Sequence, residues 1–110
     1  MKPFQPSRAG GRWFTMTLAE QLGNVGSEYE RALTWKQRGE KPHFEKAFDR
    51  MLELLDLTIA DQRWRNHRLK ELTRLRTAIC EEFYGESTES TDRDLRNYFL
   101  SFGLLARKDR

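Results

Sequence analysis

The segment HFEKAFDRMLELLDLTIAD, residues 43–61, decides the fold class of this chain. Its apolar side chains recur every three or four residues and cover more than one stripe of a helix. Such a helix is buried by two or more neighbours, because one neighbour covers only one side of it. The apolar positions are Phe44, Ala47, Phe48, Met51, Leu52, Leu54, Leu55, Leu57 and Ile59. The segment therefore predicts the central helix of a helical domain.

A helix is also predicted on the N-terminal side, over residues 17–39. Thr17 and Glu20 are spaced as a capping box, in which both side chains bond free amides of the first turn. Gly39 is expected to end the helix, because glycine readily adopts the left-handed conformation that closes many helices. The apolar positions between these ends follow alternating spacings of four and three, which is typical of one helix face.

Two glycines, Gly23 and Gly26, lie inside this predicted helix. Each costs roughly 1 kcal/mol relative to alanine. We expect close approach of a neighbouring helix to offset that cost, so the glycines mark a contact face; a hinge is the alternative. If the neighbour belongs to another chain, the protein is a structural subunit that docks a partner helix on this face.

Two further helices are predicted after the central one. The third covers about residues 68–84, with Gly85 as its stop. Residues 86–91 form a polar loop, and Thr91 and Asp94 repeat the capping-box pattern at the start of a fourth helix. The inward positions are Leu69, Leu72, Leu75, Ile79 and Phe83 in the third helix, and Leu95, Tyr98, Phe99, Phe102, Leu105 and Ala106 in the fourth.

Four helices of similar length with short connections favour antiparallel neighbours. The predicted fold class is therefore all-α, an antiparallel up-down-up-down four-helix bundle that forms a single domain over residues 15–110. Residues 1–14 hold two prolines, two glycines and three bases without an acid, so we expect a flexible basic N-terminal tail. Trp13 and Phe14 are candidates for local packing, and Met16 is an alternative start of the native protein.

Composition limits the classes of function. Outside the tail, 17 bases balance 17 acids, which argues against a protein that coats nucleic acid by net charge. Cys80 is the only cysteine, so an internal disulfide is excluded and a cytoplasmic location is expected. No run of ~18 apolar residues predicts a membrane span. A core this small is often completed by association, and a homodimer is the expected oligomer.

Positive charge is concentrated in RWRNHRLKELTRLR, residues 63–76, which we call the basic segment. It holds six Lys or Arg and one acid. Cations neutralise phosphates or carboxylates, and an aromatic ring such as Trp64 stacks on a base. We therefore predict a surface that binds RNA or an acidic protein partner. Its residues are Arg63, Trp64, Arg65, Asn66, His67, Arg68, Lys70 and Arg74.

Catalysis is the alternative function for this segment. Arg63 or Arg65 would hold a phosphate while His67 exchanges a proton near neutral pH. Such a set can cleave RNA without a metal. A purely structural interpretation also remains open, in which Trp64 packs onto the end of the helices and the bases pair with acids such as Asp61.

Two further pairs belong to that structural interpretation. Glu71 is a second acid within reach of the bases of the segment. Arg76 falls near the inward side of the third helix, where a buried cation needs an acidic partner. Glu53 and Asp56 of the central helix are the candidates for that partner.

No metal or cofactor site is predicted. Four-helix bundles can hold two irons through paired Glu-x-x-His motifs, but the chain has a single copy, Glu40 to His43, interrupted by Pro42. No glycine-rich phosphate loop follows a strand. Cys80 borders an apolar helix face, which leaves it without a base to activate it.

The run ALTWKQRGEKPHFEKAFDRMLELLDLTI, residues 32–59, resembles the opening helix pair of HEPN-type four-helix bundles. The resemblance implies metal-independent RNA cleavage or pairing with a nucleotidyltransferase-type antitoxin, usually by a homodimer. The signature of that family is an Arg followed by four to six residues and a His, often beginning Arg-Asn. In this chain three residues separate Arg63 from His67, and Arg65 and Asn66 directly precede the histidine.

Overall fold

The computed structural model describes residues 11–85 and 89–108. Within these residues every regular element is helical, which confirms the all-α prediction. The long helices are α2 (Leu18–Gln37), α3 (Lys41–Ala60), α4 (Leu69–Tyr84) and α5 (Glu89–Lys108), and the short ones are α1 (Gly11–Trp13) and the 3-10 turn η2 (Gln62–Trp64). No helix among the described residues has the length and apolar character needed to cross a membrane.

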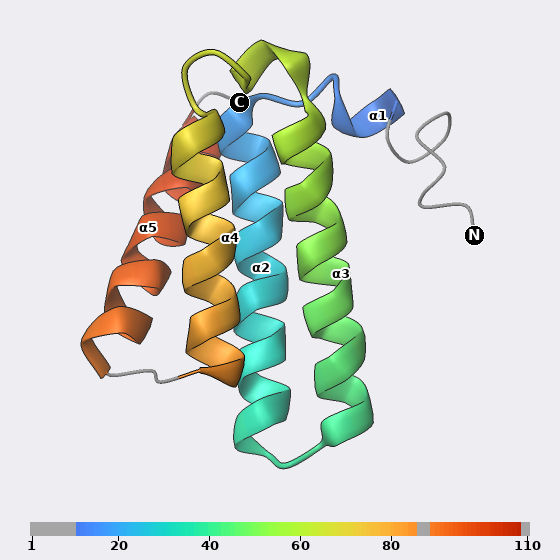
Figure 1. Cartoon of the computed structure of the whole chain (residues 1–110), viewed down its shortest axis with the longest axis vertical. Helices are drawn as coiled ribbons and strands as arrows, with labels where there is room; N and C mark the ends of the chain where they lie inside the picture. Colours follow the sequence, from blue (N-terminus) through green and yellow to red (C-terminus); the bar gives the residue numbers. More distant parts are fainter. Residues whose placement is uncertain (1–10, 86–88, 109–110) are drawn as a thin grey trace.

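The four long helices lie side by side, with η2 forming the turn at one end (Figure 1). Helix α3 contacts both α2 and α4, as predicted for the segment 43–61. Helix α2 contacts α3 and α5, and its side chains Leu22, Val25 and Tyr29 are completely buried. The central position is therefore shared by α2 and α3.

Both ends of α2 follow the sequence pattern. The Thr17 hydroxyl accepts a hydrogen bond from the Glu20 amide at 3.1 Å, and the Glu20 carboxylate accepts one from the Thr17 amide at 2.9 Å. At the other end Gly39 has φ +72°, in the left-handed region. The Gly39 amide donates to Lys36 and the next amide donates to Trp35, which together close the helix as a Schellman motif. The predicted capping box and glycine stop are confirmed.

The two glycines of α2 contact α5 of the same chain. A Cβ added at Gly26 would lie 2.6 Å from the Cβ of Phe99, and one added at Gly23 would lie 3.5 Å from the Cα of Gly103. Close approach therefore offsets the cost of both glycines, as predicted. The helix that lies closest to these two glycines is therefore α5 of the same chain.

Helix α5 differs from the sequence prediction in two respects. It begins at Glu89, so Thr91 lies inside the helix and does not open it with a capping box. An early start is favourable, because acidic residues near a helix N-terminus interact well with the helix dipole. Leu105, predicted to face inward, is 47% exposed, since the last buried side chain of α5 is Phe99.

The chain packs earlier than the predicted domain boundary at residue 15. Trp13 is 5% exposed, and its indole Nε1 donates to the Thr58 hydroxyl at 3.1 Å. This bond attaches α1 to the last turn of α3. Residues 1–10, the remainder of the predicted tail, lie outside the described residues.

Candidate interaction surface

The basic segment spans η2, the turn that follows it and the first half of α4 (Figure 1). Its six cations divide into two equal groups. Arg63, Arg68 and Arg76 form ion pairs with Asp61, Glu71 and Asp56, respectively. Arg65, Lys70 and Arg74 have no acidic partner among the residues that the structure describes.

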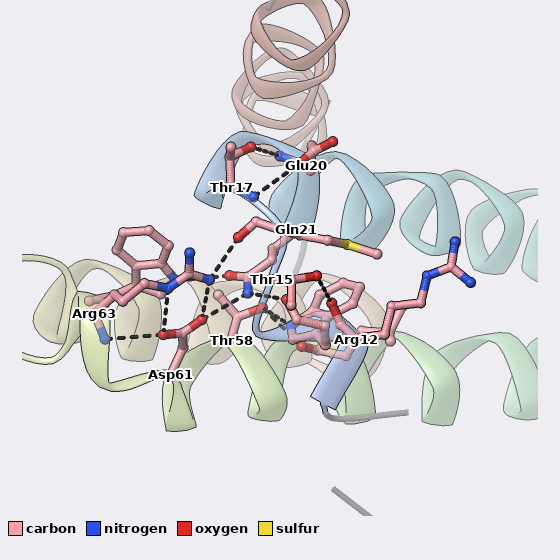
Figure 2. Close-up of polar contacts among 12 residues, drawn as sticks. Arg12, Thr15, Thr17, Glu20, Gln21, Thr58, Asp61 and Arg63 are labelled. Atoms are coloured by element: carbon pink, nitrogen blue, oxygen red, sulfur yellow. Dashed lines mark hydrogen bonds and ion pairs between the residues drawn. The ribbon is translucent and has the colours of Figure 1, made fainter. Parts of the chain in front are cut away.

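Arg63 is held on several sides. Its Nε and Nη2 donate to the two carboxylate oxygens of Asp61 at 3.0 and 2.7 Å, and Nη2 also donates to the Met16 carbonyl at 2.7 Å (Figure 2). Its guanidinium lies 4.5 Å from the centre of the Trp64 ring. Burial alone would raise the pKa of Asp61, but hydrogen bonds from Arg63 and Gln21 outweigh it and lower that pKa below its ordinary value.

Gln21 joins this ion pair to the N-terminal residues. Its side chain is fully buried, and its amide donates to Asp61 and to the Trp13 carbonyl, both at 2.9 Å. Its carbonyl oxygen accepts a hydrogen bond from the indole of Trp64 at 2.8 Å. We call Trp13, Gln21, Thr58, Asp61, Arg63 and Trp64 the closed cluster; Figure 2 shows part of it. The structural interpretation of Trp64 and Arg63 is confirmed, and one face of the Trp64 ring is already covered.

The other two paired arginines have partners that the sequence analysis named. Arg68 donates to Glu71 at 3.0 Å, and Glu71 also accepts a hydrogen bond from the Tyr98 hydroxyl at 2.6 Å. Arg76 donates to Asp56 at 2.8 Å, which selects Asp56 over Glu53. Both ion pairs are partly exposed, so each contributes little to stability.

The unpaired cations are on the surface. Arg65, Lys70 and Arg74 are exposed, and the last two are one helical turn apart on α4. Asn66 and His67, in the turn before α4, are also exposed and make no hydrogen bond to the described residues. We call Arg65, Lys70 and Arg74 the open cations.

One of the open cations, Arg74, lies at a groove between α4 and α5. The groove has a volume of about 400 Å³. Arg74 lines it together with apolar side chains of both helices, Leu75, Ala78 and Leu95. Glu71, Thr91, Asp94 and Tyr98 complete the lining. The groove thus combines apolar side chains of both helices with one base, Arg74, and two acids, Glu71 and Asp94, and such a mixed surface suits an amphipathic segment.

No hydrogen bond joins the predicted catalytic residues Arg63, Arg65 and His67 to one another in the part of the chain that the structure describes. Both oxygens of Asp61 engage Arg63, so a phosphate would have to displace a buried carboxylate. His67 is exposed and has no hydrogen-bond partner that would orient it among the described residues. The geometry supports surface contact better than chemistry at this position.

Metal donors do not gather in the part of the chain that the structure describes. No group of three His, Cys, Asp or Glu side chains lies close enough to hold an ion. His43 instead packs against Trp35, with ring centres 4.5 Å apart. Cys80 is a free thiol, partly buried against the core.

Sequence analysis missed Gln21 and Thr58 of the closed cluster, and it named Trp13 only as a candidate for local packing. The signal for Gln21 was its place between Leu18, Leu22 and Val25, on the buried side of α2. A glutamine there needs polar partners, because an unsatisfied buried amide is costly. No such signal marks Trp13, since its partner Thr58 is 45 residues away in the chain.

No protein-family model, no curated protein and no solved structure matches this chain.

Proposed function

We propose that this protein is an interaction module that binds an acidic segment of a partner protein through the open cations. One observation carries this proposal. Half of the cations in the basic segment are exposed with no acidic partner among the described residues, while the other half form ion pairs within the fold. An exposed run of like charge costs self-repulsion, which an acidic partner would relieve.

An acidic protein segment is favoured over RNA by two features. Trp64, the aromatic side chain expected to stack on a base, packs against Arg63 and donates its indole N–H to Gln21. The groove beside Arg74 has an apolar floor, which suits the apolar face of a helix rather than a phosphate backbone. RNA would retain only phosphate contacts with the open cations.

The proposal includes the scaffold and its setting. Four long helices packed side by side suit an antiparallel up-down-up-down bundle, which presents α4 and α5 as a rigid surface. A lone free thiol suits a reducing cytoplasm. The bundle is proposed to act as a homodimer.

The test measures binding of a fluorescent acidic amphipathic peptide by anisotropy at several salt concentrations. The triple variant Arg65→Gln, Lys70→Gln, Arg74→Gln should bind ~10-fold more weakly, since exposed pairs contribute roughly 0.2–1 kcal/mol each. Its binding should also depend less on salt. The control variant Lys41→Gln, Lys46→Gln, Arg93→Gln removes the same charge from exposed positions outside the segment and should bind as the wild type does.

Equal losses in the two triple variants would show that binding follows net charge and would overturn the proposal. A single-stranded RNA of matched charge is the second probe. Tighter binding of that RNA than of the peptide would replace the acidic partner with a nucleic acid. Cleavage of the RNA by the wild type, lost in His67→Ala, would favour the ribonuclease that the HEPN resemblance implies.

A further inference from the structure

The second half of α5 exposes large apolar side chains. Leu100, Leu104 and Leu105 are 54, 53 and 47% exposed, and among the described residues only Tyr84 is a comparably exposed large apolar side chain. Leu100 and Leu104 are one turn apart and form a ridge. Leu105 points about 100° away from Leu104 around the helix axis. An apolar ridge of this kind marks a contact surface more often than an isolated leucine does.

A groove lies beside this ridge, between α2 and α5. Its volume is about 460 Å³, and Leu100 is part of its wall. The floor has little side-chain volume because Gly23, Gly26 and Gly103 line it. A Cβ added at Gly103 would meet no atom within 4 Å, so this part of the groove is open.

We propose that a second copy of this chain covers this face as a twofold homodimer. The ridge of Leu100 and Leu104 from each copy would pack into the groove of the other. A twofold axis requires one surface to be complementary to itself, and a ridge next to a groove meets that requirement. This inference gives the homodimer of the proposed function its surface, and it does not depend on the open cations.

Charge along the face supports an antiparallel arrangement of the two α5 helices. At one end Arg96 pairs with Glu30 and Asp92, which leaves one net negative charge. At the other end Arg12 and Arg107 line a continuation of the groove together with one acid, Glu20, which leaves one net positive charge. A twofold axis near the middle of the groove would bring the negative end of each copy to the positive end of the other. A parallel arrangement would place like charges together.

The first test is the mass in solution, measured by sedimentation equilibrium over a range of concentrations. The wild type should sediment at twice the monomer mass of 13.1 kDa. The variant Leu100→Gln, Leu104→Gln should dimerise at least ~100-fold more weakly, because each copy loses two buried leucines. Leu105→Gln is the matched control, being equally exposed on the same helix but off the ridge, and should remain dimeric.

A second variant separates association from folding. Gly103→Leu adds a side chain into the open part of the groove, where no atom of the same chain obstructs its Cβ. The substitution should preserve or raise helix stability, since leucine is a far better helix former than glycine. It should nevertheless weaken the dimer, because the added side chain occupies the space of the partner's ridge.

A monomeric wild type at all concentrations would overturn the inference. So would a dimer that survives both Gly103→Leu and the double leucine substitution, or one that Leu105→Gln disrupts equally. Binding of the acidic peptide is tested with variants of the open cations and is measured by fluorescence anisotropy. Loss of the dimer surface and loss of the acidic-partner surface are therefore distinguishable.

Discussion

The two ends of the basic segment differ although their sequences look alike. At its start, the closed cluster surrounds Arg63 with a carboxylate, a carbonyl and an aromatic ring. Further along the segment, Lys70 and Arg74 are exposed on α4 and form no ion pair within residues 11–85 and 89–108. The comparison shows that a run of positive charge can be part structure and part surface, and that only the neighbours in space separate the two parts.

The largest expected effect is on the closed cluster. Replacing Asp61 with alanine leaves the buried Gln21 amide without one of its two acceptors and releases Arg63. We expect the free energy of unfolding to fall by about 3 kcal/mol, because breaking a pair with a buried partner leaves polar groups unsatisfied. Urea denaturation measures it.

Asp56→Ala is the control for Asp61→Ala. It breaks the pair with Arg76, in which both side chains are about 40% exposed. Its cost should stay below ~1 kcal/mol, since exposed ion pairs contribute little. If the two alanine variants lose the same stability, Asp61 is no more important than a surface carboxylate, and the contrast between the two ends is wrong.

A smaller effect is expected from acid. Because the pKa of Asp61 is lower in the folded chain than its ordinary value of 3.8, ionised Asp61 favours folding. This contribution is fully present above the ordinary pKa and is lost as the pH falls through the folded pKa. Below pH ~4, the free energy of unfolding of the wild type should therefore fall more steeply than that of the Asp61→Asn variant. Parallel pH profiles for the two proteins would show that Asp61 does not titrate with folding.

The smallest effect on stability is expected from the open cations. The variant Arg65→Gln, Lys70→Gln, Arg74→Gln should unfold within ~0.5 kcal/mol of the wild type, because exposed side chains without partners contribute little. The same urea titration measures this. A loss above ~1 kcal/mol would mean that these cations stabilise the fold and are not available for binding.

Local patterns were enough to predict most of the helical structure. The capping box at Thr17, the left-handed stop at Gly39 and the stop at Gly85 depend on residues a few positions apart, and the structure shows each of them. The start of α5 was placed three residues late, because the capping-box pattern at Thr91 predicts a first helical residue at position 92 and the helix begins at Glu89. Patterns of this kind predict the existence of a helix more accurately than they predict its first residue.

The sequence by itself determined an all-α chain, the positions of its four long helices and the location of its concentrated positive charge. Periodicity and helix-end signals are local, so they can be recognised without knowing what lies nearby in space. Only the tertiary structure decided that Asp61 binds Arg63 while Arg74 has no acidic partner in the described part of the chain, and that Gln21 connects Trp13 to Trp64. The contacts of Gln21 join residues up to 43 positions apart, so they depend on the packing of α2 against α3.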